Sequence, residues 1–290
     1  MELKCIVVTG GAGFVGSHLC EALVAQGHRV ISLDNYFMGS RDNHVAGVEY
    51  REGHTKDIAQ HIPEKPDLIY HLGEYSRVAQ SLEEPGLVFD LNITGTCGVL
   101  EFWRKHCCKL VYAGSSTKYA DPRADGIEGR NLSPYTWAKA INTDLVEQYA
   151  NWYKLPFATV YFSNVYGPRE RADAYGTVIE IFKQRFLHGE PLEVRLPGTQ
   201  SRNYTHVADT ISALLLVGEK GQGDGYTIAA DMSYPILEVA KLFGGQITML
   251  PERKTSRPST ELDTRRMKEL GWSAKHSLKE YIADIVKQRG

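Results

Sequence analysis

Short apolar runs alternate with longer amphipathic segments through the first part of the chain. Six runs have the length and apolar content of strands, at 5–9, 29–33, 48–51, 68–72, 110–113 and 158–162. Between them, longer segments predict helices at about 13–26, 87–106 and 135–153. Several strand candidates are continuously apolar, as expected when helices cover both faces of a sheet. The alternation predicts an α/β protein with a Rossmann-type, doubly wound parallel sheet.

The pattern changes after Gly167-Pro168. A helix is predicted at Val178–His188, an extended run at 192–196, a helix from about Asp209 and a strand at 226–229. From Ile236 the tail is predicted to be mostly helical, interrupted by a polar stretch at 251–259. We expect residues 1–166 to form a dinucleotide-binding domain and residues 167–290 to form mainly a smaller α/β substrate-binding lobe. Segments near 203–230 are expected to return to the first sheet.

The composition argues against several classes of partner. Hydrophobic residues make up 42% of the 290 residues, so a sizeable core can form. The formal net charge of −2 gives no general basic field for nucleic acid or an anionic membrane. No apolar run approaches the roughly 20 residues of a membrane helix, and the first residues lack a signal-peptide pattern. We therefore expect a cytoplasmic protein.

The cysteines and histidines indicate no metal site. An odd number of cysteines, five, without framework spacing predicts reduced thiols in the cytosol. Cys107-Cys108 could bind a metal or sense oxidants, but simple thiols at a helix end are the favoured interpretation. The 10 histidines show no metal-ligand spacing.

A glycine-rich turn follows the first strand and opens a helix. Its glycines, Gly10, Gly13 and Gly16, permit a tight turn and close approach of a pyrophosphate, beside Phe14 and Val15. The helix N-terminus adds free N–H groups and a positive dipole end. The alternative is an ordinary flexible turn.

An acidic residue, Asp34, closes the second strand, about where a carboxylate grips the adenosine ribose hydroxyls. A carboxylate there repels the 2′-phosphate of NADP, so the sequence predicts NAD. Asp57, beyond the third strand, either reaches the adenine or caps a helix.

Tyr135 and Lys139 are four residues apart behind Ser133-Pro134, a pattern that fits a helix start. An ammonium group near a phenol favours the phenolate, which can then act as a base near neutral pH. Such a pair alone usually marks a solvated helix face, but behind a dinucleotide loop it predicts catalysis. Upstream, the hydroxyls of residues 115–117 either bind a sugar oxygen at the end of the fifth strand or form an ordinary turn.

Together these residues resemble the extended short-chain dehydrogenase/reductases, in particular their nucleotide-sugar epimerase/dehydratase group, of UDP-glucose 4-epimerase type. The resemblance runs nearly end to end. It rests on Thr9-Gly10-Gly11-Ala12-Gly13-Phe14-Val15-Gly16, Leu33-Asp34-Asn35, Lys56-Asp57-Ile58, His71-Leu72-Gly73, Asn92-Ile93-Thr94-Gly95-Thr96, Ser115-Ser116-Thr117, Tyr135 with Lys139, Ser163-Asn164-Val165-Tyr166-Gly167-Pro168-Arg169, and Arg202-Asn203-Tyr204 through Asp209.

The resemblance implies roles for individual residues. The catalytic residues it implies are Ser115, Tyr135 and Lys139. Beside the glycine-rich turn, the NAD contacts it implies are Asp34, Asn35, Asp57, Ile58, Leu72 and Lys139. For a nucleotide sugar it implies contacts from Ser116, Thr117, Asn164, Val178, Arg195, Arg202 and Arg257, with Arg202 and Arg257 clamping the pyrophosphate.

Ser116-Thr117 distinguishes reactions within this group. Sugar 4,6-dehydratases typically carry Asp-Glu there and UDP-glucuronate decarboxylases keep a Glu, whereas this chain looks like the 4-epimerases. The resemblance thus implies a UDP-sugar 4-epimerase that acts through a transient 4-keto intermediate, with Tyr135 taking the 4-hydroxyl proton and NAD carrying the hydride. The alternatives are an NDP-hexose 4,6-dehydratase or another NDP-sugar enzyme, and, in a different class, a non-catalytic dinucleotide-binding sensor.

Several residues depart from the family pattern. Glu74 and Tyr75 stand where small residues are usual, and Glu74 either supplies an acid for other chemistry or, as favoured here, lies at the cleft rim. Arg195 stands where an aromatic residue is usual, and Leu196-Pro197 and Asn203 also differ.

The family's homodimer is expected here as well. In that arrangement the predicted helices 87–106 and 135–153 pair with their symmetry mates as a four-helix bundle. The apolar residues Phe102, Trp103, Trp152 and Tyr153 motivate the expectation. The alternative is that these side chains pack inside the subunit.

Overall fold

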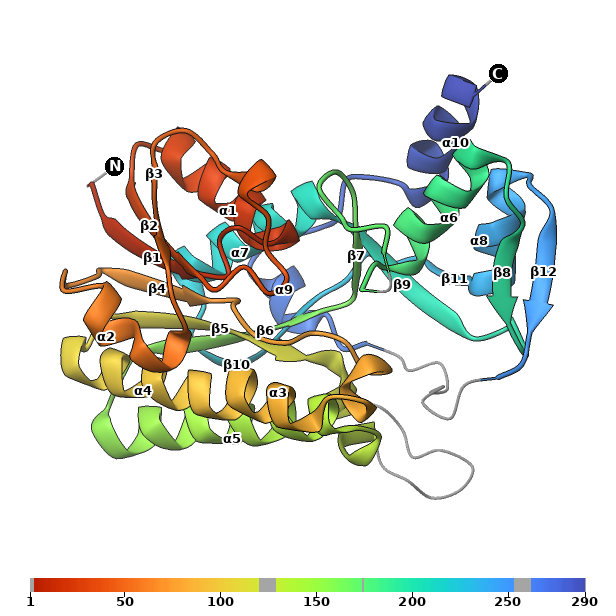
Figure 1. Cartoon of the computed structure of the whole chain (residues 1–290). Helices are drawn as coiled ribbons and strands as arrows, with labels where there is room; N and C mark the ends of the chain where they lie inside the picture. The colour runs from red at the N-terminus through yellow and green to blue at the C-terminus, as the bar shows by residue number, and fades with distance from the viewer. Residues whose placement is uncertain (1–2, 120–128, 174, 253–261, 290) are drawn as a thin grey trace.

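The protein, a computed structural model that describes residues 3–119, 129–173, 175–252 and 262–289, is built around a parallel sheet (Figure 1). Its strands are β1 (Cys5–Thr9), β2 (Arg29–Asp34), β3 (Val48–Glu52), β4 (Leu68–His71), β5 (Lys109–Ser115), β6 (Phe157–Phe162) and β10 (Gly223–Ile228). The seven strands lie in the order β10-β6-β5-β4-β1-β2-β3. Every pairing is parallel, which confirms the predicted doubly wound sheet.

Helices cover both faces of this sheet, as the continuous apolar runs predict. On one face α1 (Phe14–Ala25) packs against α7 (Val207–Lys220). The other face carries α2 (Ile58–His61), α4 (Gly95–His106) and α5 (Pro134–Tyr153) (Figure 1). Alternate residues of β1 divide between the two cores: Ile6 and Val8 join the α1/α7 side, and Val7 joins the α4/α5 side.

The predicted helix 87–106 is continuous but not uniform. It consists of α3 (Pro85–Phe89), a π-helical turn (Asp90–Thr94) and α4. Phe102 and Trp103 on α4 are fully buried in the subunit core, so these two residues cannot motivate a dimer. Trp152 and Tyr153, at the end of α5, are exposed.

A second, smaller lobe lies beside the sheet (Figure 1). It contains β7 (Asn164–Tyr166), α6 (Val178–His188), β8 (Leu192–Arg195), β9 (Ser201–His206), β11 (Ser233–Pro235), α8 (Ile236–Phe243), β12 (Ile247–Leu250) and α10 (Leu278–Arg289). Strands β11, β9 and β7 form one small sheet, and β12 pairs with β8. The largest side chains of its core include Phe182, Phe186 and Phe243.

The prediction of a mostly helical tail from Ile236 is wrong at β12. This short run pairs in parallel with β8, from Ile247 opposite Leu192 to Leu250 opposite Arg195. Four residues carry too little periodicity to reveal a strand whose existence depends on a partner edge far away in the sequence. Of the polar stretch 251–259, residues from 253 lie outside the described part of the chain.

The tail is fastened back onto the first domain by hydrogen bonds to α7. Asp209 Oδ2 accepts the backbone N–H groups of Lys275 and His276, at 3.0 and 2.9 Å. Trp272, which follows α9 (Arg265–Glu269), donates its indole N–H to Ser212 Oγ at 2.9 Å. The chain therefore crosses between the lobes more than once.

The structure bears on the expectations about membrane helices, cysteines and metal ligands. Within the described ranges, none of the helices has both the length and the apolarity to cross a membrane. All five cysteines are free, and Cys107 ends α4 in the left-handed conformation. The same ranges contain no group of three or more His, Cys, Asp or Glu side chains placed to hold a metal.

The contact between α7 and β4 leads to the first prediction. Gly218 lies so close to Tyr70 that an added Cβ would overlap the phenol oxygen. Gly218→Ala should therefore lower the free energy of unfolding by about 1–3 kcal/mol, since overpacking outweighs the better helix propensity of alanine. Urea denaturation measures the change. Gly86→Ala on α3, whose Cβ would meet no atom within 4 Å, is the matched control and should lose nothing.

Candidate functional site

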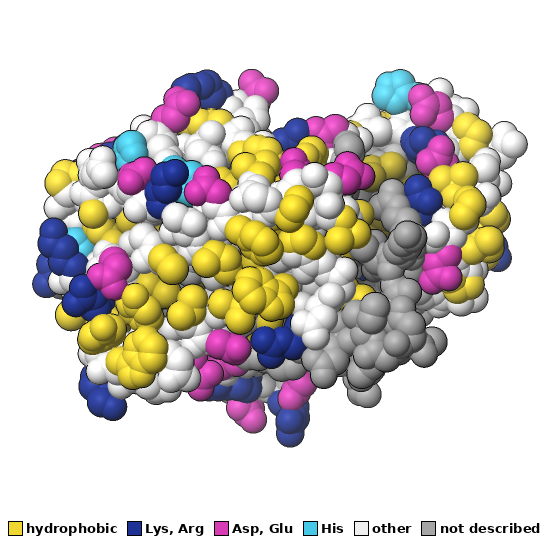
Figure 2. Space-filling model, turned by 60° about the horizontal axis from the view of Figure 1, so that its bottom comes forward, with side chains coloured by type: hydrophobic (Ala, Val, Ile, Leu, Met, Phe, Trp, Pro, Cys, Tyr) yellow, Lys and Arg dark blue, Asp and Glu magenta, His cyan; other side chains and the backbone are white. Residues whose placement is uncertain are grey.

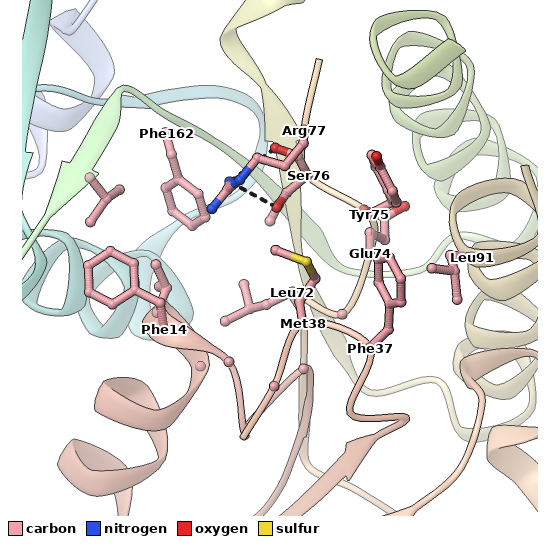
Figure 3. A pocket seen from close by; sticks show the side chains of 18 of the residues that line it. Phe14, Phe37, Met38, Leu72, Glu74, Tyr75, Ser76, Arg77, Leu91 and Phe162 are labelled. Carbon is pink, nitrogen blue, oxygen red and sulfur yellow. Dashed lines mark hydrogen bonds between the residues drawn. The ribbon is translucent and has the colours of Figure 1, made fainter. Parts of the chain in front are cut away.

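The carboxyl ends of the central strands open into one cleft of about 770 Å³. This is the edge at which parallel α/β sheets bind ligands. Most of the predicted site residues line it: Gly10, Gly13, Phe14, Val15, Gly16, Asp34, Asn35, Leu72, Ser115, Ser116, Thr117, Tyr135, Lys139 and Asn164. Figure 3 shows Phe14 and Phe162 on one side of the pocket and Phe37 and Leu91 on the other.

The glycine-rich turn is shaped for a phosphate group. Gly10 has a φ of +73°, and a Cβ there would come within 2.7 Å of the Gly73 backbone. A Cβ on Gly16 would overlap the Gly10 carbonyl oxygen. Gly13 is the N-cap residue of α1, and the helix has neither a side-chain cap nor an acidic residue in its first turn. The backbone N–H groups of this turn therefore remain available for an anion at the cleft. These features fit a dinucleotide pyrophosphate.

Asp34 is buried at the end of β2, and both of its oxygens are held in place. Oδ2 accepts the N–H of Ala12 at 2.9 Å, and Oδ1 accepts the N–H of Tyr36 at 2.8 Å. Burial raises the pKa of the carboxyl group, against the opposing effect of these two N–H groups. Each carboxylate oxygen has a second lone pair, which suits the two hydroxyls of a ribose.

Helix α5 begins where the catalytic prediction requires. Ser133 Oγ accepts the N–H of Thr136 at 3.2 Å, and Thr136 Oγ1 accepts the N–H of Ser133 at 3.0 Å. This reciprocal capping box, with Pro134 at the first helical position, fixes the helix start next to Tyr135. Tyr135 and Lys139 follow on one face, both largely buried and both lining the cleft.

The hydroxyl groups at the end of β5 lie beside this pair. Ser115 Oγ is 2.8 Å from Thr117 Oγ1 and also accepts the N–H of Thr117 at 3.3 Å. Both side chains are largely buried in the cleft wall. Ser115 is thereby oriented at the strand end, as the sequence predicts.

Glu74 is not at the cleft rim, and that interpretation is wrong. Its side chain is only 1% exposed, and it forms an ion pair with Lys139 beneath the cleft. Glu74 Oε1 accepts hydrogen bonds from Thr96 Oγ1 and Asn142 Nδ2, both at 2.7 Å. Lys139 Nζ also donates to the Ala113 carbonyl at 2.6 Å. This carboxylate can be buried because α4, α5 and β5 supply its hydrogen-bond partners.

Five described residues of the predicted site are not in the cleft lining. Ile58 is buried in the core, and Asp57, which precedes α2, accepts a 3.4 Å hydrogen bond from Gln60. Val178 opens α6, and its neighbour Thr177 lines the cleft instead. Of the three predicted arginines, Arg195 donates a hydrogen bond to the Pro251 carbonyl and Arg202 donates one to the Ser201 carbonyl. Arg257 lies outside the described residues.

Two charged residues that line the cleft, Arg77 and Glu170, are not among the site residues predicted from the sequence. Arg77, which follows β4, donates its Nε–H to the Tyr175 carbonyl, and its Nη2 lies 3.5 Å from Glu170 Oε1. Figure 3 shows Arg77 and its hydrogen bonds to Ser76. The Glu170 side chain is 2% exposed, and burial raises the pKa of its carboxyl group to about 7. Glu170 directly follows Gly167-Pro168-Arg169, so the family-like segment already marked this stretch of the chain.

The chain is similar in sequence to a known protein family and to proteins of known activity. Residues 6–229 match the model of the NAD dependent epimerase/dehydratase family. A putative UDP-glucose 4-epimerase of Methanocaldococcus jannaschii is 29% identical over 295 residues, which cover 97% of each chain. A UDP-N-acetyl-alpha-D-glucosaminuronate decarboxylase of Bacillus cytotoxicus is 30% identical over 259 residues, which cover 83% of this chain and 79% of that protein.

Two solved structures share the whole fold. The UDP-glucose 4-epimerase of Thermotoga maritima, determined with UDP-glucose, has a TM-score of 0.90 and 29% identity, over 98% of this chain and 97% of that chain. The UDP-glucose 4-epimerase of Thermus thermophilus, in complex with NAD, has a TM-score of 0.87 and 27% identity, over 98% of both chains.

The buried Glu170 makes stability depend on pH. The unfolded carboxyl group loses its proton near its ordinary pKa of 4.5, whereas the folded protein holds the proton to about pH 7. Folding therefore becomes less favourable as pH rises through this window. Glu170→Gln should remove the dependence and stabilise the protein at about pH 8 by up to about 3 kcal/mol, with no gain near pH 4.5.

Chemical denaturation at the two pH values measures this difference. Glu52→Gln, at an exposed carboxylate, is the control and should follow the wild type at both. An equal effect of Glu170→Gln at both pH values would contradict the pH-dependent origin.

Proposed function

Because the chain belongs to the NAD-dependent epimerase/dehydratase family, with NAD as its cofactor, we propose that it is a UDP-sugar 4-epimerase that acts through a transient 4-keto intermediate. The observation that carries the proposal is the convergence of Ser115, Tyr135 and Lys139 in the cleft that also contains the glycine-rich turn. Segments far apart in the sequence thus bring an acid–base group to a dinucleotide site.

The proposed cofactor contacts follow from the cleft lining. The first turn of α1 is suited to the pyrophosphate of NAD, and Asp34 and Asn35 at the end of β2 are suited to its adenosine ribose. Leu72 also lines the cleft, and Figure 3 shows it between Phe14 and Glu74. When bound, NAD accepts a hydride from the sugar and returns it, so the protein needs to supply only orientation and proton transfer.

The proposed roles in proton transfer follow from the placement of the side chains. Tyr135 removes the proton of the 4-hydroxyl group as that carbon is oxidised, and returns it after the keto sugar has turned over. Ser115, at the end of β5, donates a hydrogen bond to the same oxygen. Lys139 supplies positive charge beneath the phenol and fits the nicotinamide ribose.

Ser116 and Thr117 favour epimerisation over elimination. Loss of water from a hexose needs an acid beside the leaving hydroxyl, and neither of these side chains is an acid. Both line the cleft next to Ser115, where they are suited to binding sugar hydroxyls. The relative named as an epimerase and the relative named as a decarboxylase both have names that specify UDP sugars, which supports a UDP-linked substrate for this chain.

Glu170 supports a second candidate within the same family. Its carboxyl group, with a pKa of about 7, remains partly protonated at neutral pH and lines the cleft. Such a group can act as a general acid. Elimination of water from an NDP-hexose, or decarboxylation of a uronic acid sugar, as in the Bacillus cytotoxicus relative, would give a product of different mass.

The free thiols support a cytoplasmic location. All five cysteines are unpaired, and Cys20 and Cys108 are buried, where burial raises the pKa of each thiol to about 12. Such thiols are inert and are typical of proteins in a reducing compartment.

A homodimer is also proposed. Figure 2 shows apolar side chains gathered on the face formed by α3, α4 and α5. Trp137 and Trp152 on α5 are 43% and 61% exposed, and Phe89 packs edge-on against Trp137 with ring centroids 5.8 Å apart. Ile141, which is half-buried, lies one helical turn after Trp137 on α5 and extends this apolar face. Apolar patches of this kind mark association sites, and the paired helices fit a second copy of themselves.

The function is tested with a panel of UDP-, dTDP-, GDP- and CDP-sugars, without added cofactor, and with products read by NMR and mass spectrometry. We expect a C4 epimer of unchanged mass from a UDP-sugar. Tyr135→Phe should lower kcat by about 10²–10⁴-fold, because the proton acceptor is lost. Tyr149→Phe, on the same helix, is the control and should retain activity.

Other results would select other functions. Loss of water or of carbon dioxide would support the second candidate, and Glu170→Gln should then abolish turnover. NAD binding with no conversion of any sugar, together with unchanged biological activity of Tyr135→Phe, would favour a dinucleotide sensor and overturn the proposal.

The dimer is tested by sedimentation at micromolar protein concentration. The wild type should sediment as a dimer, and Ile141→Glu should sediment as a monomer, because it would bury two carboxylates at the interface. Met232→Glu places the same charge at a 61% exposed apolar residue outside the helical face and should remain dimeric. A monomeric wild type would refute the assignment.

A further inference from the structure

The region beneath Tyr135 and Lys139 contains more buried polar groups than the proposed reaction requires. Glu74, which follows β4, is the centre of this cluster. Its Oε2 pairs with the Lys139 ammonium, and its Oε1 accepts hydrogen bonds from three donors. The donors are Thr96 Oγ1 at 2.7 Å, Asn142 Nδ2 at 2.7 Å and Tyr112 Oη at 3.3 Å.

Glu74 is among the residues that line the cleft, but this arrangement leaves its carboxylate little freedom to contact a substrate. Both carboxylate oxygens are engaged, and the side chain is 1% exposed. A general acid must reach a reacting atom, and Glu74 reaches Lys139 instead. Its effect on the reaction must therefore pass through the lysine.

The lysine is the group through which charge reaches the phenol. Lys139 Nζ has two acceptors, the Glu74 carboxylate and the Ala113 carbonyl oxygen on β5. An unpaired ammonium group here would present a full positive charge to Tyr135, one turn earlier on α5. A carboxylate on its other side offsets much of that charge, and few water molecules can screen either group because both are buried.

The neighbouring titratable groups do not alter this balance. His71 on β4 lies between Thr96 Oγ1 and Thr9 Oγ1, at 3.1 and 2.7 Å, and burial lowers the pKa of its imidazole to about 4. Burial likewise raises the pKa of Tyr112 on β5, so its phenol stays neutral. Burial opposes ionisation of Glu74, but the charges nearby, chiefly that of Lys139, and the hydrogen bonds from Lys139 and Thr96 together outweigh it, and the pKa of the carboxyl group is lowered. Within this network the charged groups are therefore Lys139 and Glu74. On its other side Tyr135 packs with Tyr75, whose hydroxyl donates to the Glu84 carboxylate.

We propose that Glu74 is a positioning residue, which holds the Lys139 ammonium against the end of β5 and offsets the positive charge that Lys139 presents to Tyr135. This inference rests on the proposed role of Tyr135 as the acid–base group. It explains the carboxylate at a position where the family usually has a small residue. It also explains Asn142, whose amide N–H group is used to stabilise that carboxylate.

The test is a titration of Tyr135 in the NAD-bound protein, followed by the Cζ chemical shift of isotopically labelled tyrosine. The Tyr135 resonance is identified by its absence in Tyr135→Phe. In Glu74→Gln the ammonium charge is no longer offset, so the phenol should ionise at lower pH, with at least an approximately tenfold larger acid dissociation constant. The acid limb of the pH–rate profile should move in the same direction.

Two variants control for the loss of a buried carboxylate as such. Glu180→Gln removes a buried carboxylate that pairs with Lys183 on α6, and the Tyr135 titration should not change. Glu74→Asp retains the charge and should titrate near the wild-type midpoint. A Glu74→Gln protein that folds and titrates at the wild-type midpoint would overturn the proposal.

A measurement on the wild type covers the case in which Glu74→Gln does not fold. In the NAD-bound protein, nuclear Overhauser effects should connect the Lys139 Hε protons with the Glu74 Hγ protons. Their absence would show that the ion pair does not persist with cofactor bound, and would refute the positioning role. The titration and the nuclear Overhauser measurement need no sugar, and only the pH–rate profile does, so failure to find an epimerase substrate leaves both NMR tests intact.

Discussion

The Lys139–Glu74 ion pair constrains the whole site, because two charges buried beneath a cleft need partners from every side. The hydrogen bonds to Glu74 come from α4, α5 and β5, and the carboxylate itself follows β4. Removing one partner of such a pair typically costs about 3–5 kcal/mol, since the other charge is left buried and unpaired. The four elements can therefore shift relative to one another only at the expense of this network, which restrains the end of the cleft that contains Tyr135 and Lys139.

A similar rigidity exists at the other end of the cleft, by different means. There the backbone itself is packed tightly: Gly10 lies against Gly73, and the loop after β2 closes over the turn through a 3.0 Å hydrogen bond from the N–H of Ser40 to the carbonyl of Ala12. Asp34 is fixed by two backbone N–H groups. Strand β4 and the residues just after it contribute to both ends, so the distance between the dinucleotide turn and the acid–base pair is set by packed backbone.

How much was predictable follows from how local each signal is. The sheet, the glycine-rich turn and the start of α5 are encoded in short stretches, namely apolar runs, glycine spacing and Ser133-Pro134, and the structure bears these out. Glu74 was misplaced because its burial depends on Asn142 and Thr96, which have no neighbouring signal in the sequence. β12 was missed for the same reason: its strand character comes from β8. Phe102 and Trp103 were assigned to an interface because helical periodicity shows that a face is apolar, but not what covers it.

The substrate end of the cleft is where family membership is least informative. Relatives named as an epimerase and as a decarboxylase align with 97% and 83% of this chain, so the family match over residues 6–229 does not separate the two activities. At the wall opposite the glycine-rich turn, Arg77 and Glu170 meet at 3.5 Å, and burial raises the pKa of the carboxyl group to about 7. A ligand that reaches this wall meets one guanidinium and one carboxyl group, both outside the glycine-rich turn. Because the pair is weak and the carboxyl group titrates near neutral pH, this wall can present either a charged or a neutral group to such a ligand.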